Sequence, residues 1–196
     1  MSAIWLTADL HLGHRKVVEI RGFGEDTDAH DNALAANWDS RVRDNDQVWV
    51  LGDISLGRGQ REDAALEWVG RRPGVKRLVA GNHDAVHPMH SKAYKAMGAY
   101  LEVFDTVASA ATMKFNGRRI LLSHFPYAND PEGDHTSELR YQEWRMPDVG
   151  QWLLHGHTHS NVKIRGRQIH VGLDAHDLAP VSMHWVEQQI ESEVTE

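Results

Sequence analysis

Five short apolar segments of this sequence each end at residue types that bind metal ions. Every segment has four to six residues, with the length and apolar content of a β-strand. The segments are followed by Asp9-Leu10-His11, Gly52-Asp53, Gly81-Asn82-His83-Asp84, His124 and Gly156-His157-Thr158-His159. Parallel strands of an α/β sheet bring their carboxyl ends to one edge, where binding sites form. The pattern therefore predicts that these polar side chains converge.

Helical patterns separate the first three of these segments. Apolar residues recur at helical spacing over 34–42 and 65–69, and Pro88 is placed to open a third helix. An alternation of strands and helices favours parallel strands joined by right-handed crossovers. A final helix is expected after Ser182, whose side chain can cap its first turn.

The second half of the chain shows hairpins in place of this alternation. Asn116-Gly117 lies between the strand-like segments 107–115 and 118–123 and is the typical sequence of a type I′ turn. Two further segments, 161–165 and 168–171, flank another glycine-containing turn. The second half is therefore expected to form antiparallel or mixed sheet.

The composition limits the class of protein. A length of 196 residues favours a single domain over 1–196. The absence of cysteine excludes thiolate zinc sites, iron–sulfur clusters and disulfides, so that nitrogen and oxygen must hold any metal. No apolar run approaches the roughly 20 residues of a membrane helix, and we expect no membrane contact and a cytoplasmic location. The net charge of −7 argues against stable binding to duplex nucleic acid.

The candidate ligands comprise two aspartates, one asparagine and four histidines. Asp9 and His11 are two residues apart, so in an extended segment their side chains point the same way, and His157 and His159 repeat this spacing. Seven ligands are too many for one ion, but two ions that share one carboxylate would use them all. This donor set suits Mn, Fe, Ni or Zn, of which Mn is favoured. The seven candidates are Asp9, His11, Asp53, Asn82, His124, His157 and His159.

The five polar blocks, in this order over residues 9–159, resemble the calcineurin-like metallophosphoesterases. Two further stretches, Ala8–His14 and Val171-Gly172-Leu173-Asp174, are similar to those of small bacterial and phage members. The resemblance implies an α/β fold, a four-layer α/β/β/α sandwich of two mixed sheets flanked by helices. It also implies two divalent transition-metal ions.

The resemblance further implies a role for each matching residue. Asp9, His11 and His159 would hold the first metal, whereas Asn82, His124 and His157 would hold the second, with Asp53 between them. His83 would contact the scissile phosphate and protonate the leaving oxygen, and Asp84 would orient His83.

The implied reaction is phosphoester hydrolysis by in-line attack of a metal-bridging hydroxide. We expect a phosphodiesterase for small substrates such as cyclic nucleotides. A phosphomonoesterase, a nuclease or a hydrolase of nucleotide-linked lipids would use the same site. The nucleases carry a DNA-binding cap and the lipid hydrolases a membrane-docking insert, and the chain is short for either. A protein-binding scaffold without activity is the alternative of another class, but such members lose site residues that are all present here.

Segment 125–150, which separates two of the polar blocks, is the candidate for a substrate-selecting insert. Within it, Tyr127, His135 and Arg140 are the candidate substrate contacts, although an ordinary surface excursion remains the alternative. His14 is a fourth candidate because it follows Asp9 by five residues. The other histidines outside the polar blocks are expected at buried, packing or surface positions, namely His30, His87, His90, His155, His170, His176 and His184.

Overall fold

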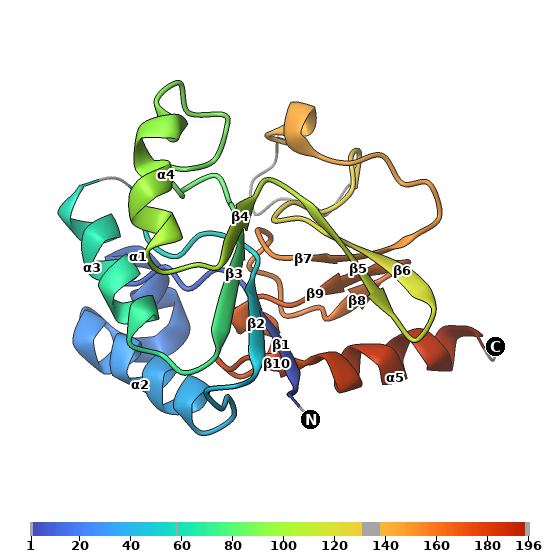
Figure 1. The fold of residues 1–196 in the computed structure, drawn as a ribbon, viewed down its shortest axis with the longest axis horizontal. Helices are drawn as coiled ribbons and strands as arrows, with labels where there is room; N and C mark the ends of the chain where they lie inside the picture. Colours follow the sequence, from blue (N-terminus) through green and yellow to red (C-terminus); the bar gives the residue numbers. More distant parts are fainter. Residues whose placement is uncertain (1, 58, 131–137, 195–196) are drawn as a thin grey trace.

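Two five-stranded sheets form the centre of the computed structural model, which describes residues 2–57, 59–130 and 138–194 (Figure 1). The first sheet contains β1 (Ile4–Thr7), β2 (Gln47–Val50), β3 (Val75–Val79), β4 (Thr106–Ala108) and β10 (Val181–Ser182). The second contains β5 (Ala111–Phe115), β6 (Arg118–Leu122), β7 (Trp152–His155), β8 (Ile164–Arg165) and β9 (Gln168–His170).

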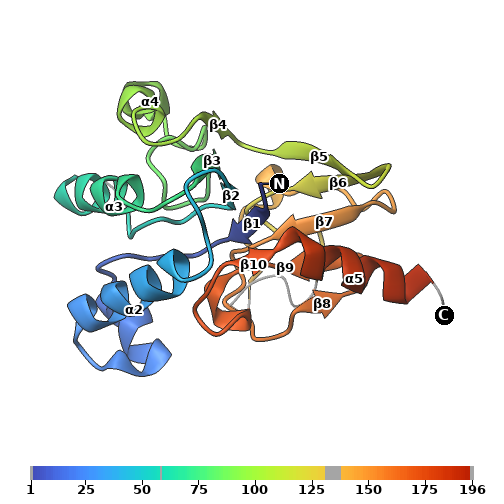
Figure 2. The ribbon, with the colours of Figure 1, turned by 60° about the horizontal axis from the view of Figure 1, so that its bottom comes forward.

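Helices flank the two sheets. They are α1 (Arg15–Val18), the π-helix η1 (Glu19–Phe23), α2 (Thr27–Asp39), α3 (Gln60–Gly70), α4 (Ala93–Leu101), the 3-10 helices η2 (Gln142–Trp144) and η3 (Leu173–Ala175), and α5 (Met183–Val194). Helices α2, α3 and α4 lie on the side of the first sheet that faces away from the second, and α5 runs beside the second sheet (Figures 1 and 2). This arrangement confirms the expected fold class. Within the described residues, no helix is long and apolar enough to cross a membrane.

Alternation along the strands divides the core into two apolar clusters. Val48 and Val50 of β2 pack in one cluster with Leu34 and Trp38 of α2, whereas Leu51 points to the opposite face and belongs to the cluster that includes the second sheet. Successive side chains of a strand point to opposite faces, so the first sheet is covered on both sides. Burial of each large apolar side chain stabilises the fold by about 1.5–3 kcal/mol.

The pairing of the strands confirms most of the predicted topology. β1, β2, β3 and β4 pair in parallel, and the second sheet is mixed, with β5·β6 and β8·β9 antiparallel and β6·β7 and β7·β9 parallel. Asn116 and Gly117 both have positive φ, of 46° and 81°, as a type I′ turn requires.

Two predicted elements differ in the structure. The segment 107–115 is not one strand, because β4 pairs with β3 in the first sheet and β5 pairs with β6 in the second, so the chain passes between sheets near residues 109–110. Pro88 does not open a helix. The chain from Asp84 to Ala93 is held in successive three-residue turns, and α4 begins only at Ala93.

The two sheets meet where β1, β2, β6 and β7 end. The backbone N–H of Asp9 donates to the carbonyl of Gly52 at 3.0 Å, and that of Gly156 donates to His124 at 3.0 Å. The backbone N–H of His157 then donates across the sheets to the Asp9 carboxylate, at 3.0 Å from both oxygens. The loops that carry the polar blocks are therefore joined directly to one another.

Candidate metal centre

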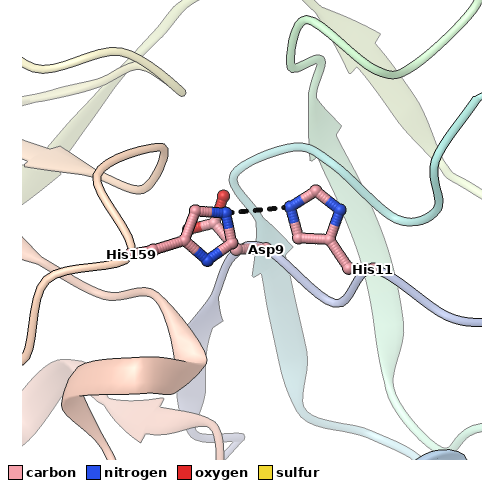
Figure 3. Close-up of side chains that lie close together, drawn as sticks. All are labelled: Asp9, His11 and His159. Atoms are coloured by element: carbon pink, nitrogen blue, oxygen red, sulfur yellow. Dashed lines mark hydrogen bonds between the residues drawn. The ribbon is translucent and has the colours of Figure 1, made fainter. Parts of the chain in front are cut away.

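Three side chains that are far apart in the sequence form the first half of a buried polar cluster. Ligand atoms of Asp9, His11 and His159 all lie within 4.8 Å of one another. The Nε2 atoms of His11 and His159 face each other at 3.1 Å (Figure 3).

The second half of the cluster surrounds His124. Its Nε2 atom lies 3.1 Å from Asn82 Oδ1, 3.3 Å from His157 Nδ1 and 3.4 Å from Asp53 Oδ2. Asp53 Oδ2 also lies 3.8 Å from His11 Nε2, which connects the two halves. The structure therefore brings together all seven residues that the sequence nominated as metal ligands.

The two-residue spacing of the ligands suggested an extended backbone, but the backbone at these residues is not extended. Positive φ values are a rare conformation that Asp, Asn and His adopt more readily than other side chains, and they concentrate at functional sites. They occur at Asp9 (59°), His11 (47°), Asp53 (58°), His157 (71°) and His159 (51°). Left-handed turns, and not strand geometry, thus direct these side chains to one point.

Glycine allows the loops to approach the carboxylates closely. A Cβ atom on Gly81 would lie 2.2 Å from Asp53 Oδ1, and one on Gly156 would lie 2.7 Å from Asp9 Oδ2. Any larger residue would have to displace a carboxylate from the cluster.

The electrostatics of the cluster favour a cation. Burial by itself would raise the pKa of Asp53, but the neighbouring His124 and His11 offset this and hold the pKa below its ordinary range. Burial lowers the pKa of His124, but Asp53 and Asp9 more than compensate and raise it to about 9. The buried carboxylates therefore favour positive charge in the cluster, and without metal a proton on His124 provides part of it. Divalent ions would supply that charge, and the nitrogen and oxygen donors suit transition metals.

Hydrogen bonds fix the orientation of several rings. His124 Nδ1 donates to the Leu51 carbonyl at 2.8 Å, and His159 Nδ1 donates to Asp174 Oδ2 at 2.9 Å. These acceptors carry no proton, so each Nδ1 is a protonated nitrogen. When the rings are neutral, as metal ligands must be, each Nε2 offers its lone pair to the cluster.

His83 lies at the edge of the cluster with its side chain 35% exposed. Its Nδ1 faces the Leu56 carbonyl at 3.2 Å, and its Nε2 lies 4.0 Å from Asp53 Oδ2. Asp84 does not orient this ring, contrary to the expectation. Both Asp84 oxygens are occupied by backbone N–H groups, those of Gly81 at 2.7 Å, Asp53 at 3.0 Å and Ile54 at 3.1 Å.

The candidate substrate contacts have different positions. His14 lies at the cluster, with its ring centroid 5.4 Å from that of His11. Tyr127 is 2% exposed and its hydroxyl donates to the Gln151 carbonyl at 2.8 Å, so it is not placed to contact a substrate, contrary to the expectation. Arg140 lies 5.3 Å from the ring of Tyr141, whereas His135 falls outside the described residues.

The structure adds residues to which the sequence analysis gave no role at the site. Asp174 contacts His159 and forms an ion pair with Arg21 at 2.8 Å. His170, which was expected only at a packing or surface position, has its Nε2 3.8 Å from Asp9 Oδ2. The ring centroid of Tyr141 lies 5.7 Å from that of His157. The stretch Val171-Gly172-Leu173-Asp174 stood out in the sequence, but nothing in the sequence indicated that Asp174 would contact His159 and Arg21.

Comparisons with known proteins agree with this geometry. The calcineurin-like phosphoesterase superfamily domain matches residues 23–171. The Gene 66 protein of Mycobacterium phage L5 is 48% identical over 186 residues, which cover 89% of this chain and 88% of that protein. The Gene 66 protein of Mycobacterium phage D29 is 48% identical over 193 residues, which cover 92% of this chain and 93% of that protein.

A crystal structure of a protein of unknown function from Aquifex aeolicus has a similar fold. It superposes with a TM-score of 0.69 at 22% identity and covers 96% of this chain and 100% of that chain. Because the superfamily domain matches most of the sequence and the Asp and His side chains form a possible metal site, this chain belongs to the calcineurin-like phosphoesterase superfamily and is a metal-dependent phosphoesterase.

Proposed function

We propose that this protein is a phosphodiesterase for small substrates, such as cyclic nucleotides, with two divalent transition-metal ions of which manganese is favoured. Asp53 would hold both ions, because its Oδ2 lies between His11 and His124. The first ion would be held by Asp9, His11 and His159, and the second by Asn82, His124 and His157. When bound, the ions neutralise charge on the phosphate and activate the attacking water.

The charge of the ligand set favours a diester. Two divalent ions and the two aspartates, Asp9 and Asp53, sum to a formal charge of about +2 when the imidazoles are neutral. This charge offsets a diester, which carries one negative charge, together with a hydroxide nucleophile. A monoester dianion would leave an excess of negative charge in a buried site, which is costly.

The position of His83 is the observation that carries the proposal. Its ring is held through Nδ1 by the Leu56 carbonyl, so Nε2 remains directed at the cluster, where it lies 4.0 Å from Asp53 Oδ2. A proton on Nε2 can be donated to the leaving oxygen of the substrate, while the exposed edge of the ring allows the proton to be replaced from solvent. His14, whose ring lies beside His11, would contact the phosphate from the neighbouring side.

Segment 125–150 would select the substrate. Its Tyr141 ring lies beside His157, and the Arg140 guanidinium lies over the Tyr141 ring. An aromatic ring and a guanidinium group next to a phosphate site suit a substrate with a flat, polar organic group.

The test is metal reconstitution of the purified protein with manganese, followed by rate measurements on a panel of phosphoesters. The panel contains bis-p-nitrophenyl phosphate, p-nitrophenyl phosphate, 2′,3′- and 3′,5′-cyclic nucleotides and single-stranded DNA. We expect diesters to be hydrolysed faster than p-nitrophenyl phosphate at equal concentration. Faster hydrolysis of the monoester would identify a phosphomonoesterase, faster hydrolysis of the DNA would identify a nuclease, and no hydrolysis would favour a scaffold.

His83→Ala tests the assignment of the acid. It should retain both ions and lower kcat by roughly 10²–10⁴, with a smaller loss for p-nitrophenyl leaving groups, which need little protonation. His184→Ala, on the exposed face of α5, is the matched control and should behave as the wild type. Loss of a metal ion in His83→Ala, or equal losses for all leaving groups, would exclude His83 as the acid.

A further inference from the structure

We infer that Asp174 and Arg21 make the two metal sites unequal, so that the ion held by Asp9, His11 and His159 binds more tightly than the other. Asp174 and Arg21 act as positioning residues through His159. The inference rests on the metal sites of the proposed function, but it does not depend on which phosphoester is hydrolysed.

The first observation is the hydrogen bond between Asp174 and His159. His159 Nδ1 donates to Asp174 Oδ2 at 2.9 Å, which leaves Nε2 directed at His11 Nε2, 3.1 Å away. A carboxylate behind a ligating imidazole fixes the tautomer and makes the ring a stronger electron donor.

Arg21 holds Asp174 in place and keeps it ionised. Its Nε donates to Asp174 Oδ1 at 2.9 Å and its NH2 group donates to Asp174 Oδ2 at 2.8 Å, a bidentate pair in which the arginine side chain is only 3% exposed. This ion pair with a buried guanidinium places an anionic carboxylate behind His159.

Arg21 also reaches the other ligands of the first site. Its guanidinium donates to the backbone carbonyl of Asp9 at 2.8 Å and to that of Leu10 at 3.3 Å, and it contacts His30 Nε2 at 3.1 Å. One side chain thus joins the loop of Asp9 and His11 to the segment of Asp174. Fixing the ligands before the metal arrives lowers the entropic cost of binding.

Two ligands of the second site, His124 and Asn82, differ from their counterparts in the first. The ring of His124 is backed by the neutral Leu51 carbonyl, at 2.8 Å from Nδ1. The ligand of the second site that corresponds to Asp9 is Asn82, whose amide oxygen is also neutral. The first site therefore has a carboxylate ligand, Asp9, where the second has an amide, and it has a carboxylate behind one of its imidazoles. Loss of such a supporting carboxylate commonly costs 10–100-fold in metal affinity.

The experiment is titration of the metal-free full-length protein with Mn²⁺, with calorimetry for the two dissociation constants and electron paramagnetic resonance for the number of bound ions. In the wild type we expect two sites of different affinity. Asp174→Asn keeps the shape of the side chain and removes its charge. It should weaken the tighter site by 10–100-fold and leave the weaker site within about twofold.

Arg21→Lys is a second variant, because lysine retains the charge but cannot form the bidentate pair. It should weaken the same site, by less than Asp174→Asn does. Asp177→Asn is the matched control: Asp177 is exposed, lies three residues from Asp174 and has a φ of 53° that asparagine tolerates, so both sites should keep their affinity.

Two equal sites in the wild type, or equal weakening of both sites in Asp174→Asn, would overturn the inference, as would no weakening at all. Unequal sites that become similar in Asp174→Asn would support it even if no phosphoester on the panel were hydrolysed. The metal titration therefore separates this inference from the proposed activity. Urea unfolding of each variant without metal shows whether the chain is folded before titration.

Discussion

Replacement of Asp84 by asparagine distinguishes two roles for a fully buried carboxylate beside the cluster. In the structure its oxygens accept three backbone N–H groups, two at Oδ2 from Gly81 and Asp53 and one at Oδ1 from Ile54. The His83 ring is instead held by the Leu56 carbonyl. Asp84→Asn should therefore affect stability and metal binding, and not the choice of leaving group.

The size of the stability change follows from the hydrogen bonds. Asparagine has one acceptor oxygen, which can take the place of Oδ2, but its amide group then faces the Ile54 N–H. A buried donor without a partner costs about 1–3 kcal/mol. Part of this loss is offset, because burial and the nearby Asp53 carboxylate raise the pKa of Asp84 to about 7, and the variant removes that unfavourable charge. The net loss should be about 1–2 kcal/mol, or about 2–8 °C in Tm for a chain of this length.

The assay has two parts. Urea unfolding of the chelated protein gives the free energy of unfolding, and Asp105→Asn serves as the control, because its carboxylate is 55% exposed in a surface ion pair and should change stability by at most about 0.5 kcal/mol. Rates on diesters with good and poor leaving groups, with manganese at saturation, should fall by one common factor in Asp84→Asn. A loss that grows as the leaving group becomes more basic, as expected for His83→Ala, would show that Asp84 acts through His83 and would refute this reasoning.

Chelation of the wild-type protein should lower Tm, because the ligands come from separate strands and bind metal only in the folded state. Each site contributes about 2.7 kcal/mol when the free metal concentration is 100-fold above Kd, and an unchanged Tm would contradict a structural metal centre. Burial lowers the pKa of His176 to about 4, below the value of about 6.5 in an unfolded chain. Between these two pH values the unfolded state binds more protons than the folded state, so the free energy of unfolding should fall by up to about 3 kcal/mol as the pH drops from 6.5 to 4. His176→Gln should flatten the free energy of unfolding against pH over that range, and an unchanged slope would assign it to other groups. Gly81→Ala should lose metal affinity, because its Cβ would lie 2.2 Å from Asp53 Oδ1, and normal metal content in this variant would be inconsistent with the geometry. Gly98→Ala is the control: its Cβ, inside α4, meets nothing within 4 Å, so it should stabilise the chain by about 0.5–1 kcal/mol.

Local sequence patterns determined much of the architecture. The apolar segments before the polar blocks are strands because a period of two and β-branched composition act over a few residues, and the Asn116-Gly117 turn needs only its own backbone conformation. The residues that gather at the cluster were also predictable, since each follows the end of a strand and parallel strands share an edge.

Long-range packing decided what the sequence left open. The segment 107–115 has one continuous strand pattern, yet its two halves pair with different sheets, because the partner strands, and not the local propensity, select the pairing. The left-handed backbone at Asp9 and His11 depends on hydrogen bonds to Gly52 and Asp53, more than 40 residues away in the chain. Tyr127 has a residue type suited to substrate binding, but the fold buries it against Gln151.

The partnership of Arg21 and Asp174 shows this limit most clearly. The two residues are 153 positions apart, and neither position alone carries a signal for an ion pair behind His159. The fold buries this pair and fixes both side chains, whereas in solvent the attraction between two unit charges at 4 Å is only about 1 kcal/mol. The sequence therefore determined which residues could bind a metal, whereas the tertiary structure decided which of their neighbours orient and charge them.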